Sequence, residues 1–268
     1  MLWDWLRRLG RSARRHSGIP DVLWQATLAD YPFLTAGTQA EQQRLRELSA
    51  LFLAEKEFHG AQGLTITDAM AVAIAAQACL PVLHFGPGRQ PLDWYDDFVG
   101  IVVHPDEVLA QREVMDEDGV VHHYDEMLAG EAMQGGPVML SWQDVAAASS
   151  ESGYNVVIHE FVHKLDLRDG QPDGCPPLPA GFLGISSTRR AREHWLLTLQ
   201  AGFEAFREQV IKAERFGAPP PWLDPYGAEA IDEFFAVASE AYFVNRTQFA
   251  RDFGALLPLF DAFYRPGA

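Results

Sequence analysis

Few features of secreted scaffolds or membrane-spanning proteins occur in this sequence. The 268 residues include only two cysteines, Cys79 and Cys175, which excludes a fold held together by several disulfides. Their spacing does not form a C-x-x-C pair, so we expect two reduced thiols rather than a metal or redox site. The most apolar run, residues 69–83, contains Gln77 and Pro81 and is too short to cross a bilayer. We expect this run to form a buried helix.

Basic residues are scarce as well. Asp and Glu number 37 against 21 Lys and Arg, which gives a formal net charge of -16. Direct binding to nucleic acid is not expected from such a composition, because it requires a basic face. Residues 1–19 depart from the pattern, since several arginines lie there opposite Trp3, Leu6 and Leu9 at helical spacing. This basic segment lacks the apolar core of a secretory signal, so we expect a cytoplasmic protein whose first helix packs on its own domain rather than on a membrane.

Hydrophobic periodicity predicts a mainly helical domain over residues 20–268. Apolar residues recur at helical spacing in five segments, namely residues 38–58, 150–167, 188–216, 228–245 and 247–264. The pattern between residues 98 and 142 is different: residues 98–103 and 136–142 are typical of strands, and residues 116–119 mark the turn of a hairpin. We therefore expect a single α+β domain with a small mixed or antiparallel sheet, preceded by the basic segment.

The motif H-E-x-x-H lies in an apolar segment, residues 156–165. On a helix, His159 and His163 lie one turn apart on the same face, so both imidazoles can bind one zinc ion. Glu160 is placed beside them, where it can take a proton from zinc-bound water. Two histidines and a glutamate are costly to bury without a partner, and a metal supplies that partner. The motif therefore predicts a zincin-like active-site helix with one zinc ion per chain.

The third ligand of this zinc has to come from another part of the chain. A catalytic zinc usually has three protein ligands and one open position. The short spacing H-E-x-x-H-x-x-G-x-x-H is absent, because Asp166 stands at the glycine position and no histidine follows. Glu233 and Glu240 lie seven residues apart, on one face of the apolar segment 230–243, where buried carboxylates need a cation or hydrogen bonds. Their position alone does not decide which of them binds the metal.

Four segments of the sequence are distinctive when taken together. The main ones are H-E-F-V-H-K-L-D at residues 159–166 and E-F-F-A-V-A-S-E at residues 233–240, and the others are G-E-A at residues 130–132 and G-P-V-M-L-S-W at residues 136–142. In this combination they resemble the Mlc titration factor A family of bacterial zinc peptidases. The resemblance extends over roughly residues 20–264. That family is in turn similar to the protease domain of anthrax lethal factor.

The resemblance implies a role for each residue of the site. Glu233 is the implied third zinc ligand, beside His159 and His163, and Glu240 is left as a supporting or structural carboxylate. Tyr226 lies seven residues before Glu233 and matches a tyrosine that assists catalysis in lethal factor. The implied reaction is hydrolysis of peptide bonds, aminopeptidase-like on short peptide substrates, with Glu160 as the base and Tyr226 as a donor to the oxyanion. The family also implies capture of a sugar-responsive transcriptional repressor, Mlc.

Other interpretations remain open at this point. The chain could be a non-enzymatic regulatory protein that sequesters a transcription factor, or the zinc could be purely structural. Asp166 is placed either to accept a hydrogen bond from a ligand histidine or to form a salt bridge. The strand at residues 136–142 could pair with an extended substrate or belong to the core. We do not expect His104, His122 and His123 to form a second metal site, because adjacent histidines on a strand point to opposite faces.

Overall fold

Helices account for most of the chain that the computed structural model describes, namely residues 18–115, 121–128, 130–132, 135–148 and 153–266. They are α3 (Asp21–Asp30), α4 (Gln39–Glu55), α5 (Asp68–Cys79), α6 (Trp142–Ala147), α7 (Val156–Asp166), α8 (Thr188–Phe216), α9 (Ile231–Val244), α10 (Arg246–Asp252) and α11 (Leu257–Tyr264). The prediction of a mainly helical domain is confirmed. Most of the basic segment at residues 1–19 lies outside the described residues.

A small sheet contains the strands in the spatial order β1 (Glu57–Gly60), β2 (Gly100–His104), β6 (Val138–Ser141) and β5 (Gly130–Ala132). The first three run parallel, and β5 is antiparallel to β6. The α+β class is confirmed, but the body of the sheet is parallel rather than antiparallel, because the crossover from β1 to β2 passes through α5. A separate antiparallel hairpin joins β3 (Val108–Met115) to β4 (Val121–Leu128), as the predicted turn required.

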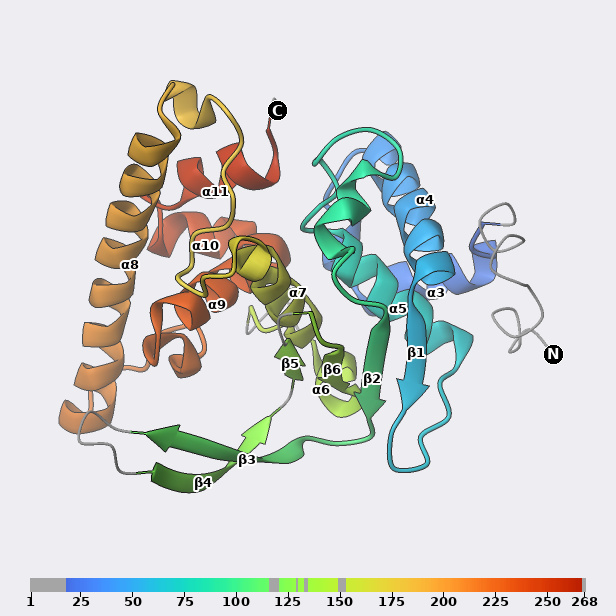
Figure 1. Ribbon diagram of the computed structural model, residues 1–268, viewed down its shortest axis with the longest axis horizontal. Helices are drawn as coiled ribbons and strands as arrows, with labels where there is room; N and C mark the ends of the chain where they lie inside the picture. The colour runs from blue at the N-terminus through green and yellow to red at the C-terminus, as the bar shows by residue number, and fades with distance from the viewer. Residues whose placement is uncertain (1–17, 116–120, 129, 133–134, 149–152, 267–268) are drawn as a thin grey trace.

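The H-E-x-x-H helix, α7, lies between two groups of helices. Figure 1 shows α3, α4 and α5 on one side of it and α8, α9, α10 and α11 on the other. The ring of Phe161, on α7, lies 5.0 Å from the ring of Tyr95. On the other side, the rings of Phe235 on α9 and Trp195 on α8 lie 5.6 Å apart. Large rings in fully buried, edge-on contacts stabilise both α7 and α9, so the two helices hold their side chains in fixed relative positions.

Several predicted helices have different bounds in the structure, and the one predicted from residue 150 begins only at Val156. The helix predicted over residues 38–58 ends before Lys56. The buried ammonium of Lys56 donates a 2.6 Å hydrogen bond to the carbonyl oxygen of Phe98, and strand β1 begins at the next residue. The segment predicted as one helix over residues 247–264 is divided into α10 and α11. Gly254 lies in the break between them, where a residue of low helix propensity lets the chain change direction.

The most apolar run is a buried helix, as predicted. Every residue of α5 except Ala69 is buried, and the Thr67 side chain caps the helix by accepting a hydrogen bond from the Met70 N–H. Cys79 and Cys175 are both buried free thiols. Among the residues that the structure describes, no helix combines the length and the apolar character needed to cross a membrane.

Candidate metal centre

The helix α7 begins at a buried cap and carries both histidines of the motif. Asn155 is the cap residue, and its side-chain oxygen accepts a 2.9 Å hydrogen bond from the Ile158 N–H. Apolar residues surround the helix almost completely, so His159 and Glu160 are buried and His163 is only partly exposed. The helical spacing therefore places two imidazoles side by side in a site that is largely closed to solvent.

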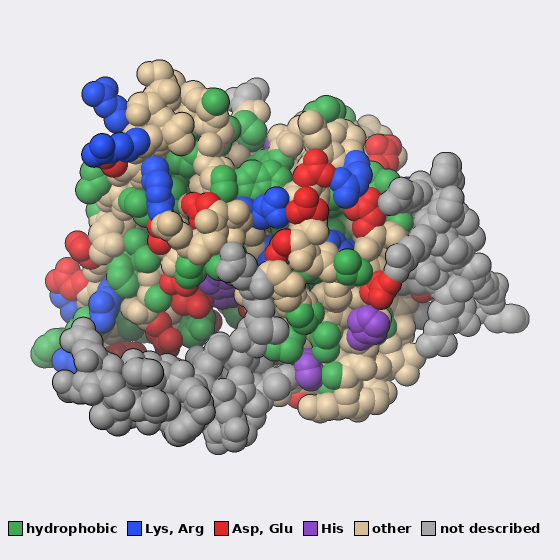
Figure 2. Space-filling view, viewed as in Figure 1, with side chains coloured by type: hydrophobic (Ala, Val, Ile, Leu, Met, Phe, Trp, Pro, Cys, Tyr) green, Lys and Arg blue, Asp and Glu red, His purple; other side chains and the backbone are tan. Residues whose placement is uncertain are grey.

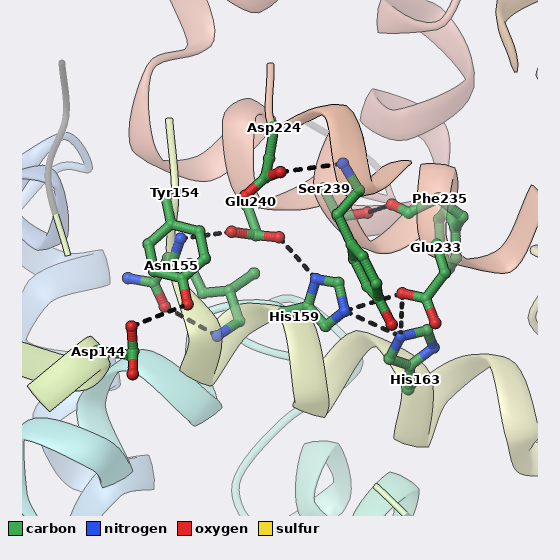
Figure 3. Close-up of polar contacts among 12 residues, drawn as sticks. Asp144, Tyr154, Asn155, His159, His163, Asp224, Glu233, Phe235, Ser239 and Glu240 are labelled. Atoms are coloured by element: carbon green, nitrogen blue, oxygen red, sulfur yellow. Dashed lines mark hydrogen bonds and ion pairs between the residues drawn. The ribbon is translucent and has the colours of Figure 1, made fainter. Parts of the chain in front are cut away.

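Three ligand atoms converge on one point at this site (Figure 3). Glu233 lies in the first turn of α9, and its Oε2 atom is 3.1 Å from Nε2 of His159 and 3.2 Å from Nε2 of His163. The two histidine Nε2 atoms are 3.1 Å apart. Two neutral imidazoles cannot both direct lone pairs at a carboxylate oxygen without a cation between them. The donor set therefore fits a metal ion, and it is the one such group of three ligands among the described residues.

The carboxyl groups of Glu160 and Glu233 lie close together but differ in their proton affinity. Burial raises the pKa of Glu160 to about 7, and the neighbouring histidines offset only part of that effect. Burial also raises the pKa of Glu233, but the contacts of its carboxylate with His159 and His163 outweigh that effect and lower the pKa well below its usual value. The two groups are thus suited to different tasks: Glu233 to bind a cation, and Glu160 to exchange a proton near neutral pH.

Glu160 also packs directly against the backbone of β5. A Cβ atom at Gly130 would lie 2.6 Å from Cγ and 2.7 Å from Cδ of Glu160, and closer still to Oε1. Glycine is the residue type that leaves room for the carboxylate here. No role for Gly130 can be predicted from the sequence alone, because a single glycine in a short strand has no distinctive pattern.

Tyr226 lies at the site, as the resemblance implied. It belongs to the short 3-10 helix η5 (Pro225–Ala228), and its ring centroid is 6.0 Å from that of His159. Asp224 fixes the local backbone, since its carboxylate accepts a 2.9 Å hydrogen bond from the Tyr226 N–H. The Tyr226 ring therefore lies next to the candidate ligand His159.

Glu240 and Asp166 are placed differently. The Oε1 atom of Glu240 is 2.7 Å from Nδ1 of His159, on the side of the ring opposite Glu233 (Figure 3). Asp166 is buried and accepts a 2.9 Å hydrogen bond from the Gly174 N–H, which attaches the loop after α7 to the helix end. The contact that orients His159 is therefore made by Glu240. The contact that the structure shows for Asp166 supports a structural role.

The remaining candidates of the sequence analysis lie elsewhere. Strand β6 pairs with β2 on one side and with β5 on the other, so neither edge of it is free. The interpretation that residues 136–142 pair with a substrate is therefore wrong. His104, at the end of β2, does not belong to a three-ligand group among the described residues, and the side chains of His122 and His123 are not described. Figure 2 shows acidic side chains gathered around a hollow in which a histidine is visible.

Comparison with known proteins agrees with this geometry. The glucose-regulated metallo-peptidase M90 family matches residues 3–265. "Mlc titration factor A" of Klebsiella pneumoniae subsp. pneumoniae is 32% identical over 264 residues, which cover 98% of this chain and 91% of the relative. The protein of the same name from Cronobacter sakazakii is 31% identical over 262 residues, with 98% and 90% covered. The resemblance found in the sequence is thus confirmed, and the chain belongs to the glucose-regulated metallo-peptidase M90 family.

Proposed function

We propose that the protein is a zinc-dependent peptidase with one zinc ion per chain, held by His159, His163 and Glu233. The observation that carries this proposal is the triangle of ligand atoms, whose sides are 3.1, 3.1 and 3.2 Å. Zinc–ligand bonds of about 2.0–2.1 Å in tetrahedral geometry place ligand atoms about 3.3 Å apart. The three side chains are therefore already close to the arrangement that zinc requires. Three protein ligands leave a fourth position open, as in catalytic rather than structural zinc sites.

The side chains around this triangle supply the proton transfers of peptide hydrolysis. Zinc, when bound, acts as a Lewis acid that polarises the scissile carbonyl and acidifies the attacking water. Glu160 takes the proton from that water and then delivers it to the leaving amine, for which a pKa of about 7 is well suited. Tyr226 donates a hydrogen bond to the oxygen on which negative charge develops.

We infer where an extended peptide would bind from the edge of the sheet next to Glu160. Strand β5 is the last strand of the sheet among the described residues, and Gly130 on this strand touches the Glu160 side chain. A peptide added along the outer edge of β5 would carry its backbone past the base and the metal ligands. We propose that β5, rather than β6, is the strand that aligns the substrate.

Glu160→Gln tests the mechanism directly. The substituted amide has nearly the same shape but cannot accept the proton, so the variant should keep its metal and lose turnover of short peptides. Metal content is measured by mass spectrometry and turnover with chromogenic peptides. Undiminished cleavage by Glu160→Gln would refute the mechanism. A panel of peptides with free and blocked N-termini tests the aminopeptidase-like activity, which cleavage of blocked peptides alone would contradict.

A second proposed function is capture of a transcriptional repressor of the Mlc type. It is supported by the name "Mlc titration factor A" of relatives that match 98% of this chain. Such a role requires a cytoplasmic location and does not require catalysis. If Glu160→Gln still binds the repressor and relieves repression, binding carries the effect. If the variant binds but no longer relieves repression, hydrolysis carries it.

A further inference from the structure

A buried chain of polar side chains leads from α5 to the metal ligand His159. Asn155 donates through Nδ2 a 2.7 Å hydrogen bond to Oε1 of Gln77, which lies in the otherwise apolar helix α5. The backbone N–H of Asn155 donates to Oε2 of Glu240. The other carboxylate oxygen of Glu240 is the one next to Nδ1 of His159 (Figure 3). Gln77, Asn155 and Glu240 are each at most 1% exposed.

Hydrogen bonds to backbone groups determine how the side-chain amides of Asn155 and Gln77 are oriented. The Asn155 oxygen accepts from the Ile158 N–H, so its nitrogen has to face Gln77. The Gln77 oxygen accepts from Asn155, and its nitrogen donates a 3.1 Å hydrogen bond to the carbonyl oxygen of Ala73. The donors and acceptors are therefore consistent from Gln77 through Asn155 to Glu240. Both the oxygen and the nitrogen of each buried amide have a hydrogen-bond partner.

This arrangement determines which nitrogen of His159 is free for the metal. The Asn155 N–H holds one oxygen of Glu240, so the carboxylate cannot rotate away from the ring. The other oxygen, 2.7 Å from Nδ1, favours a hydrogen on that nitrogen. The lone pair of Nε2 is then directed at His163 and Glu233. Glu240 and Glu233 thus act on opposite nitrogens of the same imidazole.

We propose that Glu240 is the positioning residue of His159, and that Asn155 and Gln77 hold Glu240 in place. The affinity of the metal centre then depends on a glutamine in α5, a helix that supplies no metal ligand. The inference rests on the proposed metal site and adds to it the groups that set its affinity. Carboxylates that orient metal-binding histidines typically change metal affinity by about 10–100-fold when they are replaced.

The test compares zinc affinities of full-length variants by competition with a chromophoric chelator. In Glu240→Gln the side chain keeps its shape, but its amide has one acceptor oxygen for two donors, the Asn155 N–H and the His159 Nδ1–H. We expect the dissociation constant for zinc to rise about 10–100-fold. Gln77→Met removes the acceptor of Asn155, one contact further from the metal, and should produce a smaller rise, at the low end of that range and about tenfold. Glu204→Gln, on the exposed face of α8, is the matched control and should bind zinc as the wild type does.

Two further measurements separate positioning from a merely structural role. The visible spectrum of the cobalt-substituted protein reports ligand geometry, and it should change in Glu240→Gln and stay unchanged in Glu204→Gln. The melting temperature of the metal-free protein reports the loss of packing. A lower melting temperature with unchanged zinc affinity and cobalt spectrum would overturn the inference. If Glu240→Gln does not fold, Gln77→Met decides, and zinc affinity within a factor of two of the wild type would overturn the proposal. Failure of the wild type to bind zinc would instead refute the proposed function.

Discussion

The contact between Gly130 and Glu160 leads to a strong prediction about activity. Alanine at position 130 would place a methyl group 2.6 Å from Cγ and 2.7 Å from Cδ of Glu160. Carbon atoms in contact normally lie about 3.5–4.0 Å apart, so the glutamate has to move by about 1 Å. Glu160 is only 5% exposed and cannot swing into solvent to make room. Gly130 lies in strand β5, and alanine adopts the extended conformation of a strand without strain.

The size of the effect follows from this displacement. A misplacement of about 1 Å in a catalytic group can cost about 100-fold in rate. We therefore expect kcat of Gly130→Ala to fall about 100-fold on a short peptide. Overpacking of this kind destabilises a protein by about 1–3 kcal/mol, which leaves most of a domain's stability in place. The metal ligands are not touched, so zinc content should stay at the wild-type value.

The assay measures kcat, zinc content and melting temperature on the same preparation. Gly100→Ala is the matched control, because a Cβ atom there would lie at an ordinary 3.5 Å from Pro137 in the neighbouring part of the sheet. The control should keep its activity. Wild-type kcat in Gly130→Ala would refute the placement of Glu160 as the base against β5. Loss of zinc in parallel with activity would show that the substitution disrupts the whole site rather than the base.

Three further predictions concern the same site. Tyr226→Phe should lower kcat about 100-fold and leave zinc affinity unchanged, because only the donor to the oxyanion is lost; equal losses of kcat and zinc would contradict this role. Burial raises the pKa of Glu160 to about 7, so the base is protonated below that pH. We therefore expect kcat/KM to fall about tenfold for each pH unit below about 7. A flat profile between about pH 5 and 7 would argue against Glu160 as the base. Removal of zinc by a chelator should lower the melting temperature, since zinc at about 1,000 times its dissociation constant stabilises the folded state by about 4 kcal/mol. Re-addition of zinc should restore the melting temperature. A melting temperature that does not depend on zinc would exclude a bound ion.

Local patterns predicted most of the helices because they depend on interactions within a few residues. Helix α8 has the bounds that its periodicity indicated, and α5 begins where Thr67 can cap it. The same reasoning extended the helix before Lys56 too far, because the burial of that ammonium against carbonyl groups of a distant loop is a tertiary effect. The parallel pairing of β1, β2 and β6 was likewise beyond local reasoning, since strand order depends on contacts between distant segments.

The sequence by itself determined the chemical class of the site. His159, Glu160 and His163 lie within one and a half turns of a single helix, so their shared face follows from helical geometry alone. Periodicity places Glu233 and Glu240 on one face of α9 and cannot distinguish them. The tertiary structure groups Glu233 with both histidines, in agreement with what the family resemblance implied. The crossing of α9 over α7 brings Glu233 to Nε2 and Glu240 to Nδ1 of His159. The packing of α7 against α9 sets which carboxylate lies at the ligand position and which lies behind the histidine. This packing involves residues that are distant in the chain, so local sequence patterns do not predict it.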